Sequence, residues 1–355
     1  MTDNTARKTK VLLIQGCVPE YRVPVFNMLS EHVDLTVLYS DGTVGQDAKF
    51  RTIKTPVFRM LLKIHKKNLR RIARKFDVVI CMCDTTYLYS LLLMLRPRRY
   101  RLIYWGIGVS ASYTDRYDRN QKYTDLVMKL IRRADAMLFY SQYPVDKYAA
   151  LGAPKEKLFV APNTVAVNPV QPCTKDSYLF VGSLYKQKRL EYLLEGYLAA
   201  SKTHPDIRPL VIIGDGSEKA GISKWIDENG LKEKIKLAGA IFDEDLLAEY
   251  FSRAVLCISP DQAGLSVLKS MGYGVPFVTY QNAITGGEIF NIENHTNGIL
   301  MERLDEIQLV LEDAEDHTQK YIAMGEKAKE HYWKHRQVIH MVDGFLSAIR
   351  YVISK

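Results

Sequence analysis

Short apolar runs alternate along the chain with segments that have helical spacing. Continuous apolar runs that end in glycine or polar turns predict buried strands. They occur at 10–16, 35–39, 77–83, 101–105, 178–184, 209–216, 236–240, 254–258 and 275–280. Strands that alternate with helices favour parallel sheets covered by helices on both faces. The pattern therefore predicts an α/β fold.

Three of the predicted helices differ in character. At 60–76, apolar residues alternate with cations at helical spacing, which predicts a helix with one apolar and one strongly basic side. The apolar run 87–95 predicts a buried helix between two strands, and 337–351 predicts a last apolar helix.

The length of the chain predicts two domains. It has 355 residues, and single cores stop growing near ~250 to 300 residues. The polar, proline-punctuated stretch 164–177 predicts a linker between a first domain at 1–163 and a second at 178–335. Residues 336–355 are expected to form a helix that returns to the first domain.

Cysteine usage and hydropathy predict a cytoplasmic protein. The five cysteines are odd in number and lack metal-ligand spacing, which indicates a reducing compartment. The amino terminus is polar, and the longest apolar segment, 87–95, is about half of the ~20 residues that cross a bilayer. Attachment to the inner face of the cell membrane is therefore expected to be peripheral.

Charge is distributed unevenly between the two halves. Residues 1–175 contain 29 Lys and Arg against 14 Asp and Glu, and residues 176–355 contain 20 against 26. The halves carry +15 and −6 of the net charge of +9. Ten cations in 51–76 have no acid among them: Arg51, Lys54, Arg59, Lys63, Lys66, Lys67, Arg70, Arg71, Arg74 and Lys75.

This basic segment has three interpretations. It can be a solvated helix face, a surface for anionic membrane, or a surface for nucleic acid. No base-reading motif or zinc spacing accompanies it, so nucleic acid is not expected. We predict that residues 59–75 bind an anionic membrane surface.

The stretch 259–278, SPDQAGLSVLKSMGYGVPFV, has a predicted order of strand, loop, helix and strand. In an open parallel sheet, the loop at the carboxyl end of a strand faces the ligand crevice. The helix after that loop directs free amides and the positive end of its dipole at the ligand. An anionic group is the expected ligand here.

This stretch resembles the donor-binding signature of the retaining glycosyltransferases of family four, also described as glycosyl transferases group 1. The residues that match it are Gly264, Leu265, Val267, Leu268, Met271, Gly274 and Pro276. The resemblance implies the GT-B architecture, in which two Rossmann-like doubly wound domains face a cleft. The family's paired glutamates are replaced here, the first by Asp261 and the second by Lys269. In the family the first acid faces the donor sugar and the second holds the ribose.

The resemblance implies further donor-binding residues. Lys188 matches a lysine that meets the donor diphosphate, whereas Ser183 replaces the arginine that accompanies it. Asp261 and Lys188 are therefore the expected catalytic residues. The remaining expected donor-binding positions are Gly16, Gly182, Ser183, Gly214, Gly239, Ala240, Gly264, Leu265 and Lys269.

On the acceptor side the resemblance is more general. Tyr21 and Arg22 begin the first helix and either fix an acidic acceptor or only cap and pack. Trp105 precedes Ile107, where relatives often have a histidine. Glu288 lies in a Gly-Gly-Glu segment that resembles the end of the family pattern.

The triplet Asp243-Glu244-Asp245 invites a metal interpretation, but three acids in the first turn of a helix complement its dipole, and Asp243 can cap it. We therefore expect no metal and no cofactor, since a nucleotide-sugar is a substrate.

The resemblance implies a retaining glycosyltransferase that moves a sugar from a nucleotide-diphospho-sugar to a glycan or lipid-linked acceptor, in assembly of cell-surface polysaccharide. The departures at Ser183, Lys269 and Ile107 support an alternative, a non-catalytic GT-B protein that binds a nucleotide or glycan or acts as a scaffold. The sequence leaves open the sugar, the base, the acceptor and the oligomeric state.

Overall fold

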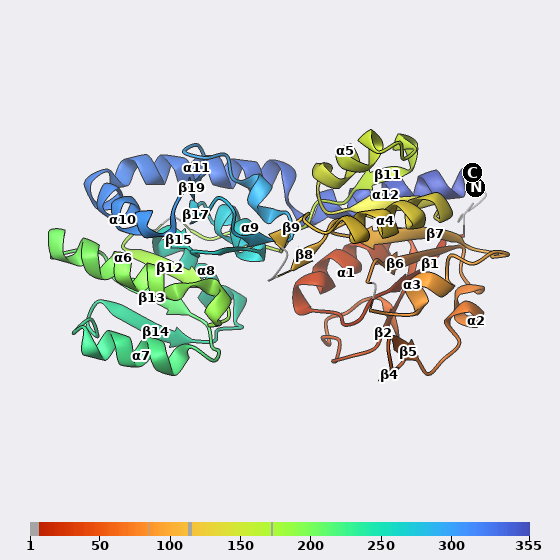
Figure 1. Ribbon diagram of the computed structural model, residues 1–355, viewed down its shortest axis with the longest axis horizontal. Helices are drawn as coiled ribbons and strands as arrows, with labels where there is room; N and C mark the ends of the chain where they lie inside the picture. Colours follow the sequence, from red (N-terminus) through yellow and green to blue (C-terminus); the bar gives the residue numbers. More distant parts are fainter. Residues whose placement is uncertain (1–6, 85, 113–115, 172) are drawn as a thin grey trace, which may run out of the picture. The chain divides into compact units, whose positions relative to one another are not determined.

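The computed structural model describes residues 7–84, 86–112, 116–171 and 173–355. Pro172, in the predicted linker, lies outside the described residues. The described residues form two compact units, one within 1–110, 118–164 and 338–355, and the other within 111–117 and 165–337. Each unit is built around its own parallel sheet (Figure 1).

The first unit contains a sheet in which each pair of neighbouring strands is parallel. Its order is β11 (Leu158–Val160), β10 (Ala136–Phe139), β7 (Arg101–Gly106), β6 (Val78–Met82), β1 (Lys10–Ile14), β2 (Asp34–Tyr39) and β3 (Arg51–Lys54). Its helices are η1 (Glu20–Arg22), α1 (Val23–His32), α2 (Leu69–Ala73), α3 (Tyr89–Leu92), α4 (Gln121–Arg133), α5 (Gln142–Ala150), η2 (Lys155–Lys157) and α12 (Val338–Ile353).

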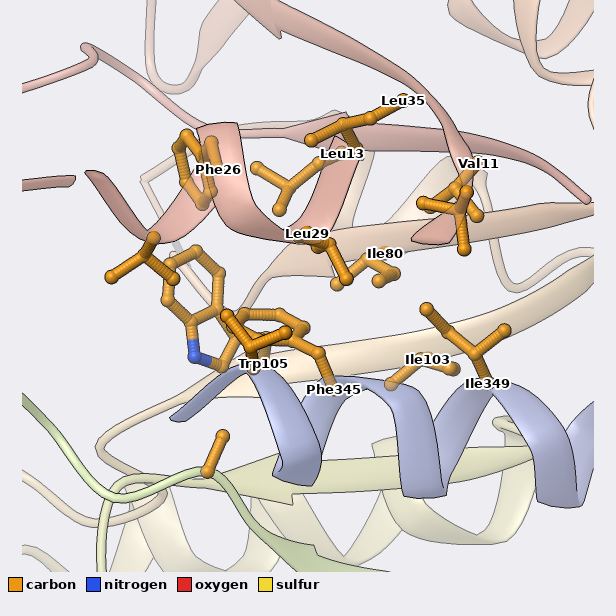
Figure 2. Packing of buried hydrophobic residues seen from close by; sticks show 14 of the residues in the cluster. Val11, Leu13, Phe26, Leu29, Leu35, Ile80, Ile103, Trp105, Phe345 and Ile349 are labelled. Atoms are coloured by element: carbon orange, nitrogen blue, oxygen red, sulfur yellow. The ribbon is translucent and has the colours of Figure 1, made fainter. Parts of the chain in front are cut away.

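Alternation along the strands divides the core of this unit into two layers. Successive side chains of a strand point to opposite faces, so Val11 and Leu13 belong to one buried cluster and Leu12 and Ile14 to another. The first cluster lies under α1 and α12, as Figure 2 shows for Phe345 and Ile349 on the last helix. The helix at the end of the chain therefore completes a core begun by the first strand.

The second unit contains a parallel sheet with the order β14 (Ile235–Gly239), β13 (Leu210–Ile213), β12 (Ser177–Val181), β15 (Ala254–Ile258), β17 (Phe277–Tyr280) and β19 (Gly298–Met301). Its helices are η3 (Lys186–Lys188), α6 (Leu190–Thr203), α7 (Lys219–Glu228), α8 (Glu244–Arg253), α9 (Leu265–Gly272), η4 (Glu288–Asn291), η5 (Leu304–Glu306), α10 (Ile307–Asp316) and α11 (Thr318–His335). Two small pairings complete it, β8 (Ala111–Ser112) with β9 (Arg116–Tyr117), and β16 (Gln262–Ala263) with β18 (Ile284–Thr285).

Both sheets are doubly wound. In the second unit the chain runs from β12 outward to β14, then returns to β15 and runs outward the other way. The first unit does the same, with β1, β2 and β3 on one side and β6, β7, β10 and β11 on the other. Each sheet thus has a topological switch point, between β12 and β15 in one unit and between β1 and β6 in the other. The predicted α/β class with two Rossmann-like domains is confirmed.

The prediction of a helix at 60–76 is wrong. That segment forms an antiparallel hairpin of β4 (Val57–Arg59) and β5 (Lys63–His65), followed by the single turn α2. Like charges three and four residues apart destabilise a helix, and this segment has no acid to relieve them. The backbone of Lys63 instead pairs with a nearby segment of the same chain. Its N–H donates to Thr86 O at 2.8 Å, and its carbonyl oxygen accepts from Leu88 N at 3.0 Å.

The helix predicted at 87–95 is present only as the single turn α3, and it is not fully buried. Tyr89 and Leu93 are buried, whereas Leu91 and Leu92 are more than a third exposed. No helix among the described residues is both long enough and apolar enough to cross a bilayer.

Candidate functional site

Glycine turns follow three adjacent strands of the second sheet. Gly182 follows β12 and donates its N–H to Ile213 O at 3.0 Å, and Gly214 follows β13 and donates to Gly239 O at 2.8 Å. A Cβ on Gly214, where φ is +152°, would lie 1.9 Å from Gly182 O. Only glycine allows the two turns to approach this closely. The predicted donor-binding glycines Gly182, Gly214 and Gly239 therefore lie side by side along one edge of the sheet.

Lys188 lies against the first of these turns. It ends η3, its side chain is buried, and its Nζ lies 3.1 Å from the position of a Cβ on Gly182. Among the described residues, no hydrogen bond or ion pair involves this ammonium group. Burial lowers the pKa of Lys188 to about 8. A partly dehydrated cation without a counterion is a suitable partner for a phosphate group.

Ser183 and Ala240 lie on the same edge and are exposed. Ser183 takes the place of the arginine expected from the family pattern, and its hydroxyl can donate a hydrogen bond but supplies no charge. Lys188 is therefore the cation that the structure places at the Gly182 turn.

The helix α9 begins on the other side of the switch point. Gly264 is its N-cap, with no side-chain cap, and the space beside this glycine is open. The first amides of the helix, at Leu265 and Ser266, have no partner within the helix, so they can donate to an anion. The helix predicted within 259–278 is confirmed as α9. It follows β15, and the Gly182 turn follows β12, so both come after the two strands that flank the switch point.

Asp261 lies in the loop between β15 and α9, and its carboxylate is already paired. It is 4% exposed and accepts two hydrogen bonds from Arg116, at 3.2 and 3.3 Å. Burial raises the pKa of Asp261, and the guanidinium of Arg116 opposes that shift. The same guanidinium donates to the backbone oxygen of Asn282. Asp261 is thus held in one orientation by a cation.

Arg116 was not found by sequence reasoning. It belongs to β9 in the second unit, although the chain up to Ser110 and from Asp118 onward belongs to the first. Its backbone has a φ of +52°, which is uncommon for a residue other than glycine. No motif surrounds it, and only the fold brings it to Asp261.

Lys269 is buried in α9 and forms an ion pair with Glu244 in the first turn of α8. A buried ammonium group needs a partner, and the neighbouring helix supplies one. Sequence reasoning assigned Glu244 only to the helix dipole. Lys269 is therefore engaged by protein in this structure, and its role toward a nucleotide stays a prediction.

Asp243 caps α8, as predicted. Its carboxylate accepts from Asp245 N at 2.9 Å and from Leu246 N at 3.0 Å. Among the described residues, no group of His, Cys, Asp and Glu has the arrangement of a metal site.

The predicted acceptor-side residues have mainly structural contacts. Trp105 is completely buried between Phe26, Tyr140 and Phe345, and its place on the acceptor side stays a prediction. Its apolar ring fills the core of the first unit (Figure 2).

Arg22 packs rather than facing solvent. It is 3% exposed, donates to Asn163 Oδ1 at 2.8 Å and to Met341 Sδ at 3.1 Å, and lies over the Trp105 ring. Of the two roles considered for Arg22, packing is the one these contacts fit. Tyr21 is at the surface, and Gly16 follows β1 with Tyr87 close beside it.

Glu288 stabilises its own turn. Its carboxylate is buried and accepts from Gly286 N at 2.9 Å and from the Thr285 hydroxyl at 3.3 Å. These contacts hold the Gly-Gly-Glu segment at the start of η4.

Residues 175–314 match the family model described as glycosyl transferases group 1. The chain is 25% identical over 173 residues to an uncharacterized glycosyltransferase of Haemophilus influenzae, a match that covers 47% of this chain and 48% of that protein. It is also 25% identical over 146 residues to the alpha-D-kanosaminyltransferase of Streptomyces kanamyceticus, covering 39% and 36%. The chain thus matches about half or less of the length of these relatives.

Among solved structures, the crystal structure of Anabaena HepE in complex with UDP matches with a TM-score of 0.72 at 14% identity. The match covers 96% of this chain and 99% of that one. The predicted resemblance to glycosyl transferases group 1 and the predicted GT-B fold are confirmed.

The shifted pKa of Lys188 predicts how nucleotide binding depends on pH. The charged form of Lys188 predominates below about pH 8 and is lost above it. If this ammonium binds the diphosphate, the affinity for UDP falls as the pH rises through 8, by at most about tenfold per pH unit. Calorimetric titration with UDP at pH 7, 8 and 9 measures this.

Two substitutions in η3 serve as matched variants for this pH dependence. Lys188→Met should bind UDP weakly at all three pH values, whereas Lys186→Ala, which changes an exposed lysine of η3, should keep the wild-type dependence. Parallel profiles for the wild type and Lys188→Met would refute the assignment.

The Asp243 cap predicts an effect on stability rather than on metal binding. Asp243→Ala removes two hydrogen bonds to α8, so it should lower the free energy of unfolding by about 1 kcal/mol. Urea unfolding measures the loss, and Glu249→Ala, an exposed acid on the same helix, is the control. A loss of activity in Asp243→Ala that magnesium or manganese restores would contradict this role.

Proposed function

We propose that the protein is a retaining glycosyltransferase that takes a sugar from a nucleotide-diphospho-sugar. The observation that carries this proposal is the buried, unpaired ammonium of Lys188 beside the Gly182 turn, at the switch point of a doubly wound sheet. The amides at the start of α9 lie at the same switch point. Together they suit a diphosphate, whose negative charge grows when the bond to the sugar breaks. The UDP-bound Anabaena structure of the same fold supports a nucleotide ligand.

The proposed reaction needs no base from the protein. The acceptor hydroxyl attacks the anomeric carbon on the face that the diphosphate leaves. The new bond joins the acceptor oxygen to that carbon, the bond from the carbon to the diphosphate oxygen breaks, and the acceptor proton passes to the diphosphate. Configuration is then retained. Ile107 instead of a histidine is compatible with this route.

In this proposal the residues of the site have separate tasks. Lys188 and the amides of Gly264 and Leu265 stabilise the charge on the leaving diphosphate. Asp261, oriented by Arg116, accepts hydrogen bonds from hydroxyls of the donor sugar. No step calls for a metal ion or another cofactor. The acceptor is a glycan or a lipid-linked sugar, as in assembly of cell-surface polysaccharide.

The alternative function is nucleotide binding without transfer. It is favoured by two contacts, since Arg116 already pairs with Asp261 and Glu244 already pairs with Lys269. Slow hydrolysis of the donor in the absence of acceptor separates the two functions. Incubation with a panel of nucleotide-sugars should give release of free sugar from one donor, whereas binding without release would favour the alternative.

We further propose that the first unit attaches to the inner face of the cell membrane through residues 59–75. The support is the lack of acids in this segment and the exposure of the β4–β5 turn, where Met60 is 73% and Leu61 is 99% exposed. Apolar side chains at the tip of a basic hairpin suit insertion into an anionic surface.

Three substitutions should divide the proposed site by function. Asp261→Asn should mainly lower kcat, and Lys188→Ala should lower both kcat and affinity for the nucleotide. Lys269→Ala should mainly weaken nucleotide binding, by ~1 to 3 kcal/mol of binding free energy if a charged hydrogen bond is lost. Calorimetry with UDP and turnover of the donor measure these effects.

Glu244→Gln is the control for the last substitution. It removes the charge that pairs with Lys269 but leaves the lysine in place, so nucleotide affinity should not fall. Equal losses in Lys269→Ala and Glu244→Gln would show that the ion pair matters only for structure. Unchanged affinity in both lysine variants would place the donor elsewhere.

Membrane attachment is tested by flotation with liposomes. With ~1 kcal/mol for each cation near an anionic surface, the protein should float with phosphatidylglycerol vesicles and be released by salt. Met60→Ser combined with Leu61→Ser should reduce the floated fraction, and Leu309→Ser, which changes an exposed leucine of the second unit, should not. Equal recovery on neutral and anionic vesicles would contradict the proposal.

A further inference from the structure

Arg189 has a backbone conformation that glycine would adopt more easily. Its φ is +55° and its ψ is 40°, which lies in the left-handed region. The residue stands where η3 ends and α6 begins, directly after Lys188. A side chain on such a backbone costs free energy, and residues in this state gather at binding sites, where the side chain has a task. The conformation therefore directs attention to the guanidinium of Arg189.

This guanidinium is oriented but only partly used. Its Nε donates to Glu191 Oε1 at 2.7 Å, and its Nη2 donates to the Tyr192 hydroxyl at 2.9 Å. Within the described ranges no other hydrogen bond involves it, so most of the five N–H groups of a guanidinium stay available. The carboxylate of Glu191 is itself half exposed, and exposed ion pairs are weak. The first turn of α6 thus holds the group in place without neutralising it strongly.

Arg189 lies near the residues of the candidate donor site. It follows Lys188, whose Nζ lies beside the Gly182 turn. Burial raises the pKa of Asp261, whereas the guanidinium groups of Arg116 and Arg189 lower it. Such an effect requires proximity, because the interaction between two charges falls with their distance. Asp261 is the residue proposed to face the donor sugar, so Arg189 lies toward the sugar end of the donor.

The site has fewer available cations than a diphosphate suits. A diphosphate group carries more than one negative charge at neutral pH. Lys188 supplies one cation, but Ser183 stands where the family pattern has an arginine, and Lys269 is paired with Glu244. A planar guanidinium with free N–H groups is well suited to phosphate oxygens. Arg189 offers such a group next to Lys188.

We propose that Arg189 binds the sugar-bearing phosphate of the donor diphosphate and takes the place of the arginine that is absent at Ser183. The inference rests on the proposed glycosyltransferase function, since it assigns a further residue to the departing diphosphate. Lys188 and Arg189 then share the negative charge that grows when the bond to the sugar breaks. The left-handed backbone persists at this position because the arginine side chain is used there.

Binding measurements on the full chain separate the two phosphates. Calorimetry compares UDP, GDP and ADP with their monophosphates, which lack the sugar-bearing phosphate. For the diphosphate that the wild type binds, Arg189→Gln should weaken binding about tenfold, and affinity for the matching monophosphate should stay within about twofold. Equal losses for the two ligands, or an unchanged affinity for the diphosphate, overturn the proposal.

Matched variants test the charge. Arg189→Lys keeps a cation on the same backbone, so it should hold diphosphate affinity within about threefold of the wild type, unlike Arg189→Gln. Lys202→Gln removes the same charge from an exposed position in the last turn of α6 and should change the affinity less than about twofold. The proposal is wrong if Arg189→Lys loses as much as Arg189→Gln, or if Lys202→Gln does.

Arg189→Gly separates binding from folding. Glycine adopts a positive φ without strain, so the nucleotide-free variant should unfold at a temperature no lower than the wild type. Its affinity for the diphosphate should nevertheless fall about tenfold. A joint loss of thermal stability and affinity would show that Arg189 only supports the fold, which contradicts the assignment.

Ser183→Arg tests whether one arginine replaces the other. Combined with Arg189→Gln, it should restore diphosphate affinity to within about threefold of the wild type. No recovery would overturn the claim that Arg189 takes the place of that arginine. A wild type that binds none of the three diphosphates fails the proposed function, whereas a wild type that binds one, with no response to Arg189→Gln, fails this inference alone.

Discussion

The candidate site depends on how closely two backbone turns approach each other. A side chain on Gly214 would place its first carbon 1.9 Å from the carbonyl oxygen of Gly182, so the ends of β12 and β13 can meet only without side chains. Gly216 approaches Leu184 O in the same way, at 2.5 Å. These contacts bring the backbone turns together, and Lys188 Nζ lies beside Gly182. Its burial, its lowered pKa and its lack of a counterion all follow from that position.

Charge at the site has been redistributed relative to the family pattern. A cation stands where the second acid is expected, and the neighbouring helix supplies an acid, so Lys269 pairs with Glu244. The first acid is kept as Asp261, but a cation from β9 holds it. Of Lys188, Asp261 and Lys269, only Lys188 has no charged partner among the described residues, and this is why we propose it as the group that binds an anion.

The fold could be predicted from the sequence because its signals are strong and local. Continuous apolar runs that end in glycine or a polar turn predicted β12, β13 and β15, since strands buried on both faces have near-continuous apolar sequences. The hairpin at 57–65 could not be predicted in this way. Its apolar residues have helical spacing, but two other effects decide the structure. The cations repel one another within a helix, and the backbone of Lys63 forms hydrogen bonds with Thr86 and Leu88.

The candidate site residues also differ in whether a local sequence motif or only the tertiary structure identifies them. Lys188, Asp261 and the start of α9 follow from a motif on one short stretch of chain each. Arg116 and Glu244 complete the electrostatics but come from segments distant in sequence, so only tertiary structure reveals them. Trp105 shows a different limit, because its place in a motif gave no sign that its ring is buried in the core.

The return of α12 to the first unit also affects how the chain folds. Val11 and Ile349 belong to one buried cluster although almost the whole chain separates them (Figure 2). On the ribosome, the first strand is made long before the helix that covers it. The second unit, nearly continuous in sequence, can close its core earlier. We therefore expect the amino-terminal unit to finish folding last, which reverses the usual order of domains during translation.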